Sequence, residues 1–194
     1  MTACLIITAL ALACNPPVET DEEAPLPKST GLAQPEQPAQ PANLRRDTAS
    51  LPVKVTPGEQ LPTFTFLTMD EKERSIEEFI GKPLMVNFWG VNCPPCRAEF
   101  PEFVEFYKKN KAEGLEIVTL NVDSSLDKQR DFLKQQEMPW VLGTDQDGKL
   151  FRKWGYRGIP TTIFVDSGGV VIDVQIGGMS RAQLDSMKSR LFQE

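Results

Sequence analysis

Two cysteines carry the clearest chemical signal in this chain. Cys93 and Cys96 are separated by two prolines, and they follow the hydrophobic run Leu84–Trp89. The residues after Cys93 predict a helix that begins at the first cysteine. A helix N-terminus presents free N–H groups and a partial positive charge, and both stabilise a thiolate. A C-x-x-C between a strand and a helix therefore favours a pair of thiols that forms and breaks a disulfide.

Composition excludes several other kinds of site. The 194 residues carry a net charge of −6 and no histidine. An acidic chain is a poor ligand for nucleic acid, and without histidine most zinc, haem and copper sites and every Ser–His or Cys–His pair are lost. Because Cys4 and Cys14 lie in the apolar N-terminal stretch, Cys93 and Cys96 are the only thiols expected in the folded part. Two thiols are too few for a four-ligand zinc site, and so short a loop makes a weak structural disulfide. We expect no metal and no cofactor.

The N-terminal stretch predicts export. Residues 5–13 are apolar, too short to span a bilayer as a helix, and end at Ala13-Cys14. We expect residues 1–14 to be a signal peptide of the bacterial lipoprotein type, with Cys14 becoming the lipidated residue on a membrane. Ala11 stands where leucine is usual, and no basic residue precedes the apolar run, which a truncated gene start would explain. Plain secretion and an uncleaved segment remain alternatives.

A long polar segment follows. Residues 15–57 are rich in proline, glutamate, glutamine, alanine and threonine and nearly lack aromatic residues. Such a sequence cannot bury enough apolar surface to offset the entropy of ordering, so we expect a disordered tether. A flexible segment of this length reaches about 35 Å. The alternative is a proline-rich recognition motif at residues 35–38. The folded domain is expected over residues 58–194.

Strand and helix patterns alternate through the folded part. Expected strands cover residues 64–67, 84–89, 115–122, 140–142, 161–166 and 170–176. Expected helices cover residues 75–80, 93–110, 126–137, 150–155 and 180–192, and Pro101 is expected to kink the second of these. This order, with a closing hairpin at residues 167–169, predicts an α/β domain with a central mixed β-sheet flanked by helices.

Four segments together resemble the thioredoxin superfamily, and more narrowly the TlpA/ResA group of membrane-tethered, extracytoplasmic thiol-disulfide oxidoreductases. They are residues 86–90, 93–101, 158–166 and 177–178. The resemblance covers about residues 60–194 and implies a thioredoxin-like fold. It includes an extra helix-strand insertion around residues 126–142, which is typical of this group.

The resemblance assigns roles to the C-x-x-C loop. Cys93 would be the exposed nucleophile that attacks a partner disulfide, and Cys96, one helical turn inward, would be the buried thiol that resolves the mixed disulfide. Pro94 and Pro95 would rigidify the loop, and Pro95 suits a first-turn position where a missing N–H costs little.

It also implies supporting residues outside the loop. Pro160 is expected to be cis and packed against the Cys93 sulfur, so that the Ile159 backbone pairs with an extended peptide. Glu99 matches an acidic residue that would help manage thiol protonation; the alternative is a solvated helix charge. Trp89 is expected to pack beneath the active-site loop as a structural residue.

Two positions depart from the family pattern. Asn92 stands before the first cysteine, where relatives usually have tryptophan, which changes the surface beside the reactive sulfur. Asn87 occupies a position that is a buried aspartate in thioredoxin itself. Asparagine is common there in the TlpA/ResA group, but it cannot shuttle a proton.

The resemblance implies a lipid-anchored oxidoreductase on the periplasmic or extracytoplasmic face of the bacterial envelope. It would reduce disulfides of protein partners, as relatives do in cytochrome c maturation, with electrons from an upstream protein donor. Ile159 before Pro160 resembles the reducing members. The same residues could instead serve a disulfide oxidant or isomerase. A thiol peroxidase on the same fold would need a threonine motif before its cysteine, which residues 91–93 lack. A non-catalytic binding module could keep the fold. A copper chaperone is disfavoured because the chain has no histidine.

Overall fold

The computed structural model describes residues 53–193. The expected signal peptide with Cys14, and the tether up to residue 52, lie outside this range. Val55 falls within the predicted tether but packs against the folded domain. Its side chain is buried, and its carbonyl accepts a hydrogen bond from the Tyr156 hydroxyl. No helix within the described range is long and apolar enough to cross a membrane.

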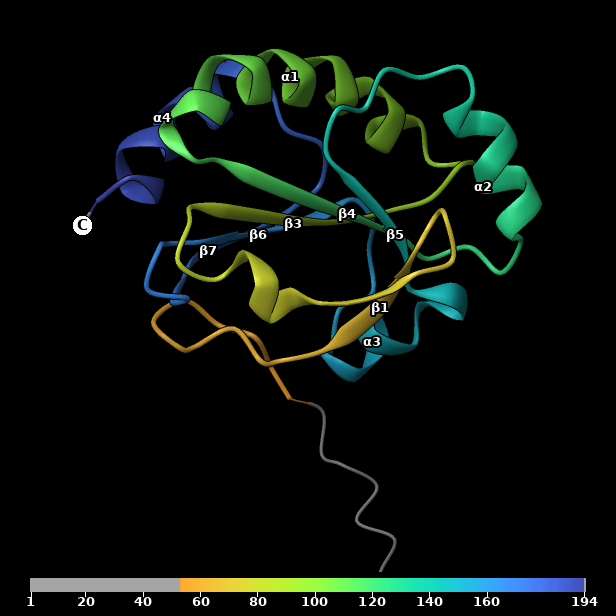
Figure 1. Ribbon diagram of the computed structural model, residues 1–194, viewed down its shortest axis with the longest axis horizontal. Helices are drawn as coiled ribbons and strands as arrows, with labels where there is room; N and C mark the ends of the chain where they lie inside the picture. The colour runs from red at the N-terminus through yellow and green to blue at the C-terminus, as the bar shows by residue number, and fades with distance from the viewer. Residues whose placement is uncertain (1–52, 194) are drawn as a thin grey trace, which may run out of the picture. The chain divides into compact units, whose positions relative to one another are not determined.

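Seven strands form one sheet in the order β2-β1-β5-β4-β3-β6-β7 (Figure 1). Their bounds are β1 Thr65–Thr68, β2 Glu73–Ser75, β3 Leu84–Trp89, β4 Glu116–Asn121, β5 Val141–Thr144, β6 Thr161–Val165 and β7 Val171–Ile176. β4 lies parallel to both β3 and β5, while every other neighbouring pair is antiparallel. The predicted mixed sheet is confirmed.

Helices cover both faces of the sheet. α1 (Pro94–Asn110) and α4 (Arg181–Leu191) lie together over one face, while α3 (Lys149–Lys153) lies on the other (Figure 1). α2 (Leu126–Leu133) belongs to the predicted insertion between β4 and β5. The remaining helices are single 3-10 turns, at Ile76–Phe79, Lys111–Glu113 and Gln146–Gly148.

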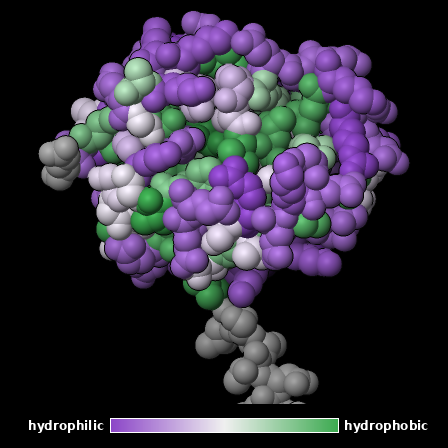
Figure 2. Space-filling view, viewed as in Figure 1, coloured by the Kyte–Doolittle hydropathy of each residue, from purple (hydrophilic) through white to green (hydrophobic). Residues whose placement is uncertain are grey.

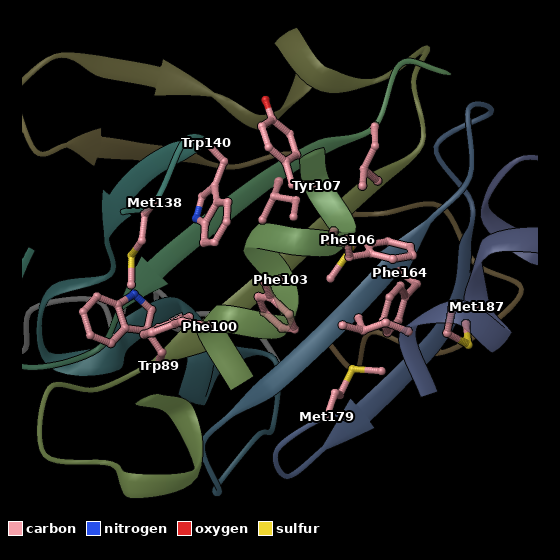
Figure 3. Packing of buried hydrophobic residues seen from close by; sticks show 14 of the residues in the cluster. Trp89, Phe100, Phe103, Phe106, Tyr107, Met138, Trp140, Phe164, Met179 and Met187 are labelled. Atoms are coloured by element: carbon pink, nitrogen blue, oxygen red, sulfur yellow. The ribbon is translucent and has the colours of Figure 1, made fainter. Parts of the chain in front are cut away.

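The central strand β3 is buried along its whole length because helices cover both of its faces. Its side chains alternate between two apolar clusters. Met85 and Trp89 pack with the helix α1 aromatics, while Leu84, Val86 and Phe88 pack on the α3 side. Figure 3 shows the first cluster, with aromatic rings of α1 between Trp89 and β6. Figure 2 shows hydrophilic residues around most of one face and hydrophobic residues towards its middle.

One helix was predicted too long, and one strand was missed. α2 ends at Leu133 rather than at residue 137, because residues 134–137 are exposed and polar and offer no side chain to the core. Pro139 follows closely and disfavours helical geometry in the residue before it. β2 was not predicted, because this edge strand has only three residues and no apolar alternation.

Candidate active site

The structure joins Cys93 and Cys96 in a disulfide at the start of α1, with an S–S distance of 2.03 Å. Cys93 is the N-cap of the helix, and its sulfur lies 3.3 Å from the backbone nitrogen of Cys96, which donates to it. Pro94 and Pro95 occupy the first helical positions, where their missing N–H groups cost little. The local sequence thus places both sulfurs at the positive end of the helix dipole.

The expectation that Cys93 is exposed was wrong for this oxidised loop. Cys93 is 8% exposed and Cys96 is fully buried. The Cys93 backbone nitrogen donates to the Gly90 carbonyl at 3.2 Å, which turns the loop back toward the domain while the sulfur is bonded to Cys96. Cys93 is still the more accessible of the two, so any attack from outside would reach it first.

Two further segments, the cis-proline loop and the segment after β7, approach the residues that flank the disulfide. The Ile159–Pro160 peptide bond is cis, as predicted, and Pro160 is buried. The Pro160 carbonyl accepts a hydrogen bond from Gly177 at 2.8 Å, which ties the cis-proline loop to the segment after β7. A Cβ added to Gly178 would lie 3.3 Å from the Pro95 carbonyl, so this second glycine lets the segment approach the C-x-x-C loop closely. The direct contact expected between Pro160 and the Cys93 sulfur stays a prediction.

Glu99 lies one helical turn after Cys96 and is 1% exposed. One carboxylate oxygen accepts from the Asn87 side-chain amide at 3.0 Å, and the other accepts from the Met179 backbone at 3.1 Å. Burial raises the pKa of Glu99 to about 7, although these two hydrogen bonds act to lower it. The interpretation as a solvated helix charge is therefore wrong; a role in thiol protonation stays a prediction.

Asn87 joins Glu99 to the central sheet. Its side-chain nitrogen also donates to the Thr162 hydroxyl at 3.0 Å, while its side-chain oxygen is buried without a partner. A flipped amide would turn that oxygen toward Glu99 and could accept a hydrogen bond from a protonated carboxyl. The network can therefore accommodate both protonation states of Glu99 through this one side chain.

Trp89 is fully buried in the same apolar cluster as both active-site cysteines. Its ring contacts Phe100 edge-on at 5.1 Å between centroids and Phe132 at 5.4 Å. This packing fits the expected structural role beneath the loop. Trp140 and Trp154 are also buried.

Sequence reasoning missed Asp123, which fixes the other side of the loop. Its carboxylate accepts a hydrogen bond from the Val91 backbone at 2.7 Å and one from the Asn121 side chain at 3.2 Å. The available signal was strand register: β3 and β4 are parallel, and Trp89 pairs with Asn121. Residues just after the two strands must then lie side by side.

Within residues 53–193, no group of three or more metal-ligating side chains is placed to hold a metal ion. The site itself consists of the two bonded sulfurs at the start of α1, with the buried Glu99 one helical turn further along the helix. Together, fold and site define a thioredoxin-like thiol-disulfide oxidoreductase.

Comparison with known proteins agrees. The Redoxin family model matches residues 56–191, and the chain belongs to this family. It is 30% identical over 138 residues to thiol-disulfide oxidoreductase ResA of Bacillus thuringiensis subsp. konkukian, covering 71% of this chain and 80% of the relative. For ResA of Bacillus subtilis the identity is 29% over 130 residues, covering 67% and 73%.

A solved structure shows the same architecture. A putative thiol:disulfide interchange protein DsbE from Chlorobium tepidum superposes with a TM-score of 0.65 at 25% identity, covering 71% of this chain and 96% of the other. The chain is thus a thiol-disulfide oxidoreductase of the ResA/DsbE type.

Proposed function

We propose that this protein reduces disulfides of other proteins in the bacterial cell envelope, held at a membrane by a lipid on Cys14. The observation that carries the proposal is the Cys93–Cys96 disulfide at the start of α1, enclosed by the cis-proline loop and the Gly177-Gly178 segment. In such a site Cys93 is the more accessible of the two sulfurs, and Cys96 lies within reach for the resolving step.

The reaction balances as two exchanges. The Cys93 thiolate attacks one sulfur of the partner disulfide, and the partner's other sulfur leaves as a thiolate. The Cys96 thiolate then attacks the Cys93 sulfur and releases the first partner sulfur. The partner gains two electrons, and the enzyme is left as the disulfide seen in the structure. An upstream dithiol protein must then reduce it by the same chemistry.

Glu99 is proposed to manage a proton in the second exchange. It lies on the same face of α1 as Cys96, three residues further on, and its pKa of about 7 lets it exchange a proton near neutral pH. A carboxylate at this place would accept the Cys96 proton as the thiolate forms.

The N-terminal sequence supports the location and the tether. Residues 1–14 have the pattern of a lipoprotein signal, and the predicted tether, up to the residues around Val55 that pack on the domain, has the composition of a flexible linker. By resemblance to the TlpA/ResA group, we propose cysteine pairs of apocytochrome c as one substrate class.

Partner trapping tests the proposal. In the full chain, Cys96→Ser should accumulate mixed disulfides with envelope proteins, because the attacking Cys93 remains and the resolving thiol is gone. The matched Cys93→Ser variant should trap none. Equal trapping by both variants, or by neither, would contradict the assigned roles, and trapped proteins outside the envelope would contradict the location.

A further inference from the structure

A cavity of about 460 Å³ lies beside the active-site loops. It is lined by the apolar and aromatic side chains of Val122, Phe151, Tyr156 and Ile159 and by two cations, Arg152 and Arg157. This volume is within the range of sites that hold small ligands or single side chains.

The cavity wall is held in place by its own packing. The Phe151 ring lies 5.7 Å from the Tyr156 ring and 5.3 Å from the ring of Phe88 in the central strand. The Tyr156 hydroxyl donates to the Val55 carbonyl at 3.1 Å, and burial raises the pKa of Tyr156 to about 12. The aromatic wall is therefore neutral and fixed, which lowers the entropy cost of filling the cavity.

The cavity is connected to the disulfide loop through Ile159 and Gly90. Ile159, which lines it, precedes the cis-proline, and its side chain comes within 2.9 Å of where a Cβ on Gly90 would be. Gly90 in turn accepts the backbone hydrogen bond from Cys93. On the other side of Gly158 lies Ile176, the most exposed large apolar residue of the described range at 67%. A partner segment bound at Cys93 would therefore pass close to the apolar side chains of Ile159 and Ile176.

The chain carries −6, but the segment that supplies most of the cavity lining is basic: residues 148–165 contain four cations and no carboxylate. Two carboxylates lie next to lining residues and accept backbone hydrogen bonds, Asp145 from Leu150 and Phe151 and Asp123 from Val91. Of the seven arginines in residues 53–193, four pair with carboxylates and Arg97 lies over the Phe132 ring. Arg152 and Arg157 make neither kind of contact within that range, and both line the cavity. Two such guanidinium groups at one apolar cavity suit carboxylates supplied from outside.

We propose that this cavity is a specificity subsite for the disulfide partner. It takes one aromatic or aliphatic side chain of an extended acidic segment, while carboxylates beside that side chain bind Arg152 and Arg157. The inference rests on the proposed function, since it names the substrate class of the same site. An anionic membrane surface would also attract the cations, but it would not need an aromatic-walled cavity next to Ile159.

The test uses the reduced full chain and short peptides, each carrying one cysteine as a mixed disulfide with 2-mercaptoethanol. One peptide places phenylalanine and aspartates near the cysteine, a second replaces the aspartates with lysines, and a third replaces the phenylalanine with serine. Cys93 attacks the peptide sulfur and 2-mercaptoethanol leaves, so its release reports the rate. Hydroxyethyl disulfide serves as a neutral substrate that makes no use of the cavity.

The variant Arg152→Gln/Arg157→Gln removes both cations of the cavity. Its matched control is Lys149→Gln/Lys153→Gln, which also removes two positive charges, from the two ends of the helix that carries Arg152, at residues that do not line the cavity. For the acidic phenylalanine peptide, we expect the arginine variant to react about five- to tenfold more slowly and the lysine variant to change less than about twofold. Both should reduce hydroxyethyl disulfide at the parent rate.

Equal rates for all three peptides, or equal effects of the two variants, would overturn the subsite while leaving the proposed function intact. Loss of hydroxyethyl disulfide reduction by the parent would overturn the proposed function instead. In that case a labelled acidic peptide with serine in place of cysteine still tests the subsite, through weaker binding to the arginine variant alone. Unchanged peptide rates with lost binding to phosphatidylglycerol vesicles would assign the cations to a membrane and refute the proposal.

Discussion

Replacing Glu99 by glutamine should change how the stability of the protein depends on pH. Burial raises the pKa of Glu99 from 4.5 to about 7, so the folded protein holds this proton more tightly than the unfolded chain does. The contribution of Glu99 to the free energy of unfolding is therefore fully present below about pH 4.5, and it is lost as the pH rises through about 7. Between pH 5 and pH 8 the loss amounts to about 2.5 kcal/mol, at 1.36 kcal/mol for each unit of pKa difference.

Glutamine removes this titration with little change of shape. Its oxygen can accept from the Met179 backbone, and its amide can donate to a flipped Asn87, whose side-chain oxygen lacks a partner. We therefore expect Glu99→Gln to be close to the parent in free energy of unfolding at about pH 5. It should be more stable by about 2 kcal/mol at about pH 8.

Urea unfolding of the oxidised full chain at several pH values measures this difference directly. Glu105→Gln is the matched control, because it removes an exposed carboxylate from the same helix. Curves of unfolding free energy against pH that run parallel for parent and Glu99→Gln would refute the reasoning. A Glu105→Gln curve that reproduced the Glu99→Gln effect would refute it equally.

Three further changes test the scaffold around the site. Gly143→Ala should destabilise the domain by about 2 kcal/mol in urea unfolding, because its Cβ would lie 2.5 Å from the Phe66 ring in a packed core. An unchanged unfolding midpoint would show that the Phe66 ring moves aside without cost and would contradict this prediction. Asp123→Ala should leave the Val91 N–H without its acceptor and cost about 1 to 3 kcal/mol, with faster amide exchange at Val91 as the readout; unchanged exchange would contradict its role. Ser180→Ala breaks the capping box of α4 and should cost about 1 kcal/mol by the same unfolding assay, whereas no loss would mean that packing alone holds the helix start.

Much of the scaffold could be predicted because local signals and tertiary structure agree. Leu84–Trp89 is apolar except for Asn87, and it is the strand buried along its whole length. Ser180 followed by an apolar stripe predicted the last helix, which has its buried residues on that stripe. The cis bond before Pro160 came from the family resemblance, since local sequence gives such a bond only a low frequency.

Other features depend on neighbours that are distant in sequence. Burial of Glu99 could not be read from its helix, because Asn87 and Met179 enclose it from a strand and from the segment before α4. Asp123 became visible as a support of the loop only through the parallel register of β3 and β4. The end of α2 was missed because polar helix-forming residues continue past the last side chain that reaches the core.

The direction of electron flow is the central claim, and the reduction potential of Cys93–Cys96 tests it most directly. The full chain would be equilibrated with defined ratios of reduced to oxidised dithiothreitol or glutathione, and the fraction of disulfide measured by thiol alkylation. A reductant of protein disulfides should give a value near that of thioredoxin, about −270 mV. A value near about −120 mV would identify an oxidant and contradict the account.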